Sequence, residues 1–169
     1  PPARLRQTQQ TRLEELAQLA IGQGPVDITV VHISRFLQAI GNDGVMRSPS
    51  IEWDMAGESR RERIMSGSTA RKLQAAMRDV VNRGTARGIR PELHGLDGWT
   101  LGGKTGTAQV AGARDDGWFT GLVFDPENKA RFTVTVYLRG GGPGAAQPAD
   151  IAAHLTRTLV STAGWIVSR

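Results

Sequence analysis

The stretch from Gly98 to Gln109, GWTLGGKTGTAQ, contains the residues of this sequence whose types and spacing point most directly to chemistry. Gly98 to Thr105 satisfies the phosphate-loop pattern G-x-x-x-x-G-K-[ST], in which backbone N–H groups and a lysine hold the phosphates of a nucleotide. The same residues contain a second motif, Lys-Thr-Gly from Lys104 to Gly106. The first interpretation requires a loop followed by a helix, and the second places these residues on a strand.

The surroundings of Lys104 argue against a phosphate loop. Such a loop needs a buried strand before it and a helix directly after it, because the helix N-terminus and successive N–H groups bind the phosphates. The preceding residues, RPELHGLD, do not resemble a buried strand, and the residues after Thr105, GTAQVAGARDDG, show no apolar period of 3.6. We therefore predict that the phosphate-loop match is accidental. A nucleotide-binding protein would require a helix after Thr105.

Hydrophobic periodicity predicts four helices around these motifs. They are expected at Leu13 to Ala20, from Thr29 as N-cap to the turn Gly41 to Gly44, from Ser66 or Ser68 to near Gly84, and at about Ala149 to Val160. The last helix is expected to pack on a sheet through Ile151, Leu155 and Leu159.

Three strands are predicted after the third helix, at Trp99 to Thr107, Trp118 to Phe124 and Arg131 to Leu138. The third alternates apolar and polar residues, as a half-buried antiparallel strand does. Two shorter strands are expected around residues 51–53 and 61–65. The sequence therefore predicts an α+β fold, in which the strand of Lys104 and the two strands that follow it form an antiparallel sheet packed by helices.

Composition and charge predict one domain with no nucleic-acid partner. The chain has 169 residues, of which 39% are hydrophobic, which is enough for one core. Its net charge of +5 could attract an anionic partner. The basic residues are scattered, however, and acidic residues interrupt the only tight cluster, Arg60, Arg61 and Arg63. A solvated face is the expected interpretation of that cluster.

Neither a metal, a cofactor nor a membrane span is expected in this chain. It has no cysteine, and its three histidines, His32, His94 and His154, are too scattered for a metal site. No apolar run approaches the roughly 18 residues of a membrane span. Because the first residue is Pro1 and not methionine, we expect that the chain is processed or cut from a longer protein.

The Lys-Thr-Gly motif occurs within a longer order of motifs. It appears as GGKTGTAQV followed by GWFTGLVFDPE, and it is preceded by AIGQGPVDITVVHISRFLQAIGNDGVMRSP and LQAAMRDVVNRGTA. From about Ala20 to Val160 this order resembles the carboxyl-terminal half of the transpeptidase domain of penicillin-binding proteins, especially the monofunctional type of cell division or elongation. One departure is Val30, where the family usually has a proline, which helps a helix to start but is not required.

The resemblance implies a β-lactamase/transpeptidase-like fold and a serine acyl-transfer enzyme of the cell envelope. Such an enzyme acts outside the cytoplasmic membrane, in the periplasm of a Gram-negative cell. It attacks the D-alanyl-D-alanine end of a peptidoglycan stem peptide, passes the acyl group to an amine on a neighbouring strand, and is acylated by β-lactams that mimic the substrate.

The resemblance also implies roles for four residues. Lys104 would supply positive charge to the cleft, and Thr107 would contribute its backbone N–H as one of two oxyanion donors. Thr105 and Thr107, two apart on a strand, would present hydroxyls along one face to the substrate carboxylate. Gly106 would let the substrate approach and pair along the strand edge. The implied catalytic residues are Lys104 and Thr107, and the implied substrate-binding residues are Thr105, Gly106 and Thr107.

The serine nucleophile of that family does not occur in this sequence. No serine begins an S-x-x-K motif, and no S-x-N occurs. In the family both motifs lie upstream of G-Q-G. We therefore expect residues 1–169 to be the carboxyl-terminal portion of a larger transpeptidase domain, inactive alone, with any membrane anchor upstream. The expected partner is the upstream half of that domain or an exchanged oligomer, because a sheet edge and an apolar helix face would otherwise be uncovered.

A non-catalytic cell-envelope interaction module of the same fold is the alternative interpretation. The remaining candidates are weaker. Trp99 and Trp118 could line a substrate groove, although aromatic residues on strands more often pack in a core. Asp115 and Asp116 are expected at a loop tip and not as a catalytic pair. His32 is expected to be a surface or half-buried histidine and not a base.

Overall fold

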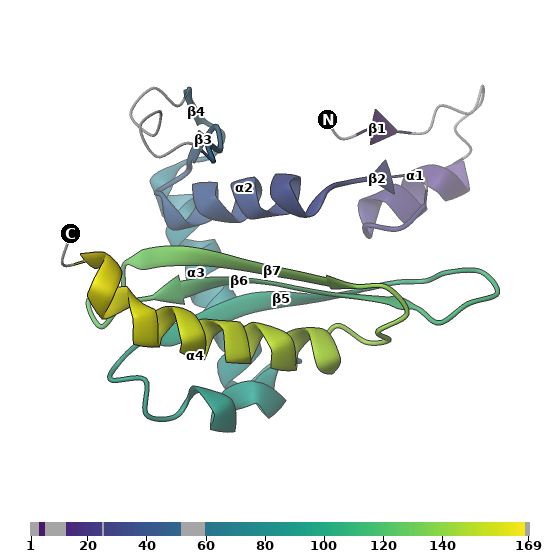
Figure 1. Cartoon of the computed structure of the whole chain (residues 1–169). Coiled ribbons are helices and arrows are strands. Elements are labelled where there is room, and N and C mark those ends of the chain that lie inside the picture. Colours follow the sequence, from purple (N-terminus) through teal and green to yellow (C-terminus); the bar gives the residue numbers. More distant parts are fainter. Residues whose placement is uncertain (1–3, 6–12, 25, 52–59, 168–169) are drawn as a thin grey trace.

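The computed structural model describes residues 4–5, 13–24, 26–51 and 60–167 (Figure 1). The helices are α1 (Leu13–Ala20), α2 (Val30–Gly41), α3 (Gly67–Asn82), the 3-10 helix η2 (Arg87–Leu93) and α4 (Gln147–Val167). The strands are β1 (Arg4–Leu5), β2 (Val26–Asp27), β3 (Val45–Arg47), β4 (Arg61–Arg63), β5 (Thr100–Ala108), β6 (Asp116–Phe124) and β7 (Ala130–Leu138). The predicted α+β fold is confirmed.

The three long strands form one antiparallel sheet in the order β5-β6-β7. Helix α4 covers one face of this sheet, and α2 and α3 lie on the other face (Figure 1). In the turn between β6 and β7, Asn128 adopts a left-handed φ of 63°. Within the described residues, β5 and β7 are edge strands, since no other strand pairs with their outer sides.

The face of the sheet toward α4 forms the larger part of the core. Its buried residues include Phe119, Val123, Val134 and Val136, and they pack against alanines of α4. The expected inward stripe of α4 was wrong for Ile151 and Leu155, which are 39% and 45% exposed, whereas Leu159 packs against this core as expected. Among the described side chains of α4, the buried ones are Pro148, Ala149, Ala152, Ala153 and Thr156. The small side chains let the helix lie close to the sheet, whose aromatic and β-branched side chains provide the volume.

The opposite face is closed only toward the end of β6. There Leu122 and Phe124 pack with Leu37 of α2 and Met77 of α3. Gly102 of β5 allows α3 to cross the sheet closely, because a Cβ at this position would lie 2.9 Å from the backbone nitrogen of Arg78. This glycine therefore fixes the distance between α3 and β5.

The predicted capping residues of α2 and α3 are confirmed. The Thr29 hydroxyl accepts a hydrogen bond from the His32 N–H at 3.3 Å, and the Ser66 hydroxyl accepts one from the Thr69 N–H at 3.1 Å. Strand β4 confirms the short strand expected around residues 61–65, and it pairs antiparallel with β3, which lies outside the predicted ranges. The other short strand was expected around residues 51–53. Residues 52 and 53 lie outside the described residues.

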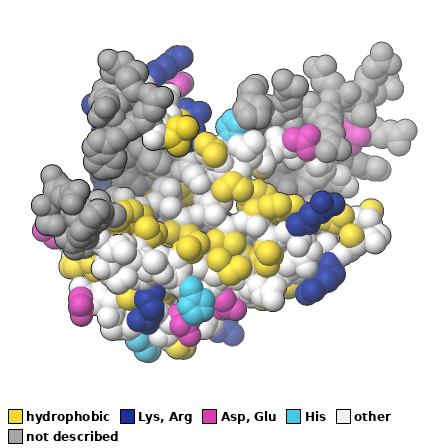
Figure 2. Space-filling view, in the orientation of Figure 1, with side chains coloured by type: hydrophobic (Ala, Val, Ile, Leu, Met, Phe, Trp, Pro, Cys, Tyr) yellow, Lys and Arg dark blue, Asp and Glu magenta, His cyan; other side chains and the backbone are white. Residues whose placement is uncertain are grey.

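An apolar strip is exposed along the outer side of β7. Figure 2 shows hydrophobic side chains gathered between α2 and α4, and Ile151 and Leu155 of α4 are among the exposed large hydrophobic residues. Together with the open edges of β5 and β7, this agrees with the expected uncovered sheet edge. None of the helices in the described ranges has the length and apolar character needed to cross a membrane.

Candidate functional site

The Lys-Thr-Gly motif lies in the middle of strand β5. Lys104 pairs with Thr120 of β6, and Thr105 pairs with Phe119. The strand continues to Ala108 and is followed by a turn into β6, so no helix begins after Thr105. The rejection of the phosphate-loop interpretation is therefore confirmed.

The pleat of β5 sends neighbouring side chains of the motif to opposite faces. Lys104 and Gly106 share the face of Thr120 and Trp118, their register partners, and Thr105 and Thr107 share the other face. The Thr105 hydroxyl lies 2.9 Å from that of Thr85, the residue that follows Gly84 after α3. The lysine and the two threonines thus lie on opposite faces of β5.

A groove of about 850 Å³ begins at β5 and extends over Trp118 and Thr120 of β6 and Tyr137 of β7, on the sheet face toward α2. One wall is β5, from Lys104 to Ala108, and the other is the segment that joins α1 to α2 together with the first turn of α2. The second wall is mostly apolar; its residues include Ile21, Val26, Ile28, Val30 and Ile33. The groove therefore combines an apolar wall with the polar edge of a strand, which is typical of a ligand site.

Lys104 supplies positive charge to the groove. Its side chain is exposed, and its amine donates a hydrogen bond to the Thr105 carbonyl oxygen at the strand edge. Because the carbonyl groups of Thr105 and Thr107 lie two residues apart on the strand, they point toward the same edge. The ammonium group is thus held beside the backbone groups with which an extended ligand would pair.

The residue Gln23 connects the loop after α1 to the end of β5. Its side-chain Nε2 donates to the Thr107 carbonyl oxygen at 2.8 Å, and its Oε1 accepts from the Gln109 N–H at 3.3 Å. Sequence reasoning included the G-Q-G motif only as part of the family resemblance. Its contact with residues 84 and 86 positions away has no signal in local periodicity.

Three hydroxyl groups form a chain that leads from α2 to Thr120, which lines the groove. Ser34 of α2 donates to the Thr135 hydroxyl at 2.9 Å, and the Thr135 and Thr120 hydroxyls lie 3.1 Å apart. Thr120 is the register partner of Lys104. Sequence reasoning missed these residues, although the polar face predicted for β7 contains Thr135.

One end of the groove is bounded by an ordered acidic and aromatic cluster. The Tyr137 hydroxyl donates to one carboxylate oxygen of Asp116 at 2.6 Å, and the Gly140 N–H donates to the other at 2.7 Å. These two bonds lower the pKa of Asp116, and the bond to Asp116 raises the pKa of Tyr137. Asp116 is the first residue of β6 and not a loop-tip residue, so that expectation was wrong for it.

The two tryptophans proposed as groove residues have different positions. Trp118 lines the groove, and its ring centroid lies 4.5 Å from that of Tyr137. Trp99 packs against the core on the α4 side, with its ring centroid 6.0 Å from that of Phe132. Only Trp118 could therefore contact a ligand in the groove.

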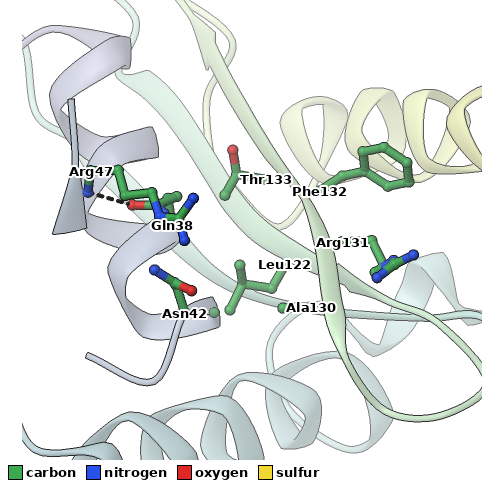
Figure 3. Close-up of a pocket in the computed structure, with 9 residues that line it drawn as sticks. Gln38, Asn42, Arg47, Leu122, Ala130, Arg131, Phe132 and Thr133 are labelled. Carbon is green, nitrogen blue, oxygen red and sulfur yellow. Dashed lines mark hydrogen bonds between the residues drawn. The ribbon is translucent and has the colours of Figure 1, made fainter. Parts of the chain in front are cut away.

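A smaller pocket of about 320 Å³ between α2, β3 and β7 is a weaker candidate (Figure 3). Its polar groups are largely occupied. The Gln38 amide oxygen accepts from the Arg47 N–H at 3.1 Å, Asn42 donates to the Val45 carbonyl at 2.9 Å, and Arg131 pairs with Asp125 at 3.5 Å. We interpret this pocket as a packing space behind α2.

Two of the three histidines have a polar side chain as a neighbour in the part of the chain that the structure describes. His32 Nδ1 lies 2.7 Å from the Thr29 hydroxyl, and exposed His154 lies 3.9 Å from a carboxylate oxygen of Glu92. No group of three or more histidine and acidic residues within the described ranges could hold a metal ion.

Sequence comparison connects this chain to known proteins. The family model described as penicillin binding protein transpeptidase domain matches residues 6–160. Penicillin-binding protein PbpB of Mycolicibacterium smegmatis is 30% identical over 170 residues, which cover 89% of this chain and 26% of that protein. Penicillin-binding protein 3 of Bacillus subtilis is 25% identical over 138 residues, which cover 75% of this chain and 20% of that protein. The chain thus spans about a quarter or less of these relatives.

Solved structures show the same fold. A penicillin-binding protein (PBP2) from Helicobacter pylori superposes with a TM-score of 0.73 at 24% identity, over 92% of this chain and 28% of that chain. Penicillin-binding protein A of M. tuberculosis, in an imipenem acyl-enzyme complex, superposes with a TM-score of 0.62 at 22% identity, over 85% of this chain and 34% of that chain.

Proposed function

The chain belongs to the penicillin-binding protein transpeptidase family, and from this membership we propose that it supplies the Lys-Thr-Gly side of a serine-type D,D-transpeptidase site. The observation that carries the proposal is the position of Lys104 to Thr107 on an edge strand that borders a groove of about 850 Å³. An open strand edge can accept an extended peptide as an additional strand. The ligand class is therefore a peptide with a terminal carboxylate, namely the D-alanyl-D-alanine end of a peptidoglycan stem.

The proposed mechanism assigns backbone and side-chain groups of β5 to different tasks. The serine Oγ, from the upstream part of the parent domain, attacks the carbonyl carbon of the penultimate D-alanine. Negative charge develops on the carbonyl oxygen, and the Thr107 N–H stabilises it as one oxyanion donor. The peptide bond to the terminal D-alanine breaks, and the proton lost by the serine hydroxyl ends on the leaving amine. An amine of a neighbouring strand then attacks the serine ester, a new amide bond forms, and a proton of that amine restores the serine hydroxyl.

Lys104 and the threonines hold the substrate in this scheme. The Lys104 ammonium supplies positive charge for the substrate carboxylate, and the Thr105 and Thr107 hydroxyls offer hydrogen bonds to it. Gly106 has no side chain that would separate the substrate from the strand. Trp118 and the apolar wall of the groove exclude water around the reacting groups.

The proposed partner of this chain is the upstream half of the same domain. Residues 1–169 would form the carboxyl-terminal portion, and the missing serine and S-x-N motifs would come from the upstream half, across the uncovered sheet edge or by exchange between copies. The acyl-enzyme complex formed with imipenem by penicillin-binding protein A is consistent with β-lactams as ligands of the complete domain. The proposed location is the cell envelope, on the outer side of the cytoplasmic membrane.

The alternative function is that of a non-catalytic envelope module of the same fold. The observation in its favour is the sequence itself, which has no S-x-x-K serine. A parent gene without such a motif upstream of Pro1 would support this alternative.

Labelling with a fluorescent penicillin tests the two functions. The chain alone and the chain together with the upstream segment of its gene are incubated with the probe and separated by denaturing electrophoresis. We expect a covalent label only when both parts are present, because the serine and β5 must form one site. No label although both parts are folded would contradict the enzymatic function and favour the module.

A further inference from the structure

The G-Q-G motif has a physical role that the proposed reaction does not yet include. Gln23 donates to the carbonyl of Thr107 and accepts from the N–H of Gln109. In a parallel pair of strands, one residue bonds in the same way to the two residues that flank its partner. Here the flanked residue is Ala108. The Gln23 amide thus occupies the edge of β5 at its carboxyl end, as a strand of one residue would.

The glycines on both sides of Gln23 bring its side chain to that edge. Gly22 and Gly24 have φ angles of +77° and +84°, in the left-handed region that favours glycine. The Gln23 N–H and the Ile21 N–H both donate to the Gln18 carbonyl, so the loop closes directly on the end of α1. The spacing Gly-Gln-Gly is therefore the local requirement for turning the glutamine toward β5.

The contact bears on the oxyanion donor through the geometry of Thr107. In a strand the N–H and C=O of one residue point to the same edge. Because the Thr107 carbonyl meets Gln23 on the outer edge, the Thr107 N–H also points outward, toward the groove and not toward β6. Fixing the carbonyl and the Gln109 N–H restrains the backbone on the carboxyl side of this donor.

We propose that Gln23 is a positioning residue, which holds the Thr107 backbone so that its N–H stays directed at the reacting carbonyl. Gln23 also marks the end of the strand edge at which an extended ligand can pair, leaving the part up to Thr107 for the substrate. This inference rests on the proposed function, because the oxyanion exists only if acylation takes place at β5.

Two variants and a matched control test the role. Gln23→Ala removes both bonds, and Gln23→Glu retains only an acceptor for the Gln109 N–H. The control is Gln74→Ala, because Gln74 also donates from its side chain to a backbone carbonyl, that of Ile40 at 2.7 Å, but between α3 and α2. A general loss of stability would affect the control as well.

The first measurement is amide hydrogen exchange in this chain, followed residue by residue by NMR. We expect Gln23→Ala to accelerate exchange of the Gln109 amide by about tenfold, the effect of one lost hydrogen bond, and Gln74→Ala to leave it unchanged. Unchanged exchange in Gln23→Ala would overturn the proposal, because the contact would then not restrain β5. This result does not depend on whether the protein is an enzyme.

The second measurement is the rate of acylation by a fluorescent penicillin in the protein that includes the upstream segment. We expect Gln23→Ala to lower the first-order acylation rate by about tenfold with little change in initial binding, since an oxyanion donor acts mainly in the transition state. We expect Gln23→Glu to lie between Gln23→Ala and wild type in Gln109 exchange but to acylate as slowly as Gln23→Ala.

The outcomes separate the two proposals. If the wild type acylates and Gln23→Ala acylates equally fast, the positioning role is overturned while the proposed function stands. If the wild type does not acylate, the proposed function fails and the catalytic part of the positioning role fails with it, whereas the exchange data still decide whether Gln23 restrains β5.

Discussion

The two faces of the β5-β6-β7 sheet differ in packing although they are made by alternate residues of the same strands. Toward α4, Phe119 and Val123 are fully buried against alanines. Toward α2, the face is closed around Leu122 and opens at Thr120 and Lys104 into the groove. The comparison teaches that the pleat lets one face of a sheet pack fully against a helix while the other face opens into a groove at Lys104.

The largest effect on stability is expected from the closed face. Phe119→Ala should lower the free energy of unfolding by about 3–5 kcal/mol, because it removes a fully buried ring from the core. Urea denaturation followed by circular dichroism measures this loss. The matched change on the open face is Trp118→Ala, which should cost less because Trp118 is only half-buried. Equal losses would contradict the comparison.

A substitution at Lys104 is expected to change stability little and penicillin labelling strongly. Lys104→Ala should leave the free energy of unfolding within about 0.5 kcal/mol of wild type, because the side chain is exposed. Fluorescent-penicillin labelling of the protein with its upstream segment should fall by roughly 100-fold, as for other groups that stabilise developing or substrate charge. The control is Lys129→Ala, which removes the same charge at the turn before β7. A similar loss of labelling in both variants would indicate a general charge effect.

The sequence predicted the parts of this arrangement that local patterns encode. The 3.6-residue stripes and hydroxyl caps located α2 and α3, and strict alternation located β7. The predicted inward face of α4 was right for Leu159 but wrong for Ile151 and Leu155, because these larger side chains were preferred to the alanines that the sheet accommodates. The distance between a helix and a sheet depends on the side chains of both, and the sequence of the helix does not show which side chains of the sheet it will meet.

The site was predictable only where its residues are consecutive. Lys104 to Thr107 form one strand, so a short motif and its neighbours were sufficient to locate it. Gln23 and Ser34 contact the sheet near this site from the amino-terminal part of the chain, through bonds to Thr107 and Thr135 that span 84 and 101 positions. Their partners are determined by how α2 lies on the sheet, which no period in the sequence specifies.

A smaller effect is expected at the helix that borders the groove. Thr29→Ala and Ser66→Ala each remove a hydroxyl cap, from α2 and α3, and each should cost about 1 kcal/mol of unfolding free energy. Because Thr29 also lines the groove, only Thr29→Ala should slow penicillin labelling. Denaturation and labelling on the same samples measure both effects. Slower labelling in Ser66→Ala would contradict this prediction, because it would show that loss of a cap far from the groove affects labelling as well.

The smallest effect on stability is expected from the hydrogen bond between Tyr137 and Asp116 at the end of the groove, and this effect depends on pH. The hydrogen bonds from Tyr137 and Gly140 lower the pKa of Asp116, so the ionised carboxylate is favoured by folding. This contribution is fully present above the unfolded pKa of about 4 and is lost as the pH falls through the lower folded pKa. Tyr137→Phe should therefore lower Tm at pH 7, and its difference from wild type should shrink toward pH 2. Thermal scans at both pH values measure the difference, with Ser66→Ala as the control whose cap bond involves no carboxyl group. A Tyr137→Phe difference that stays constant with pH would mean that the bond to Asp116 does not help to order this end of the open face.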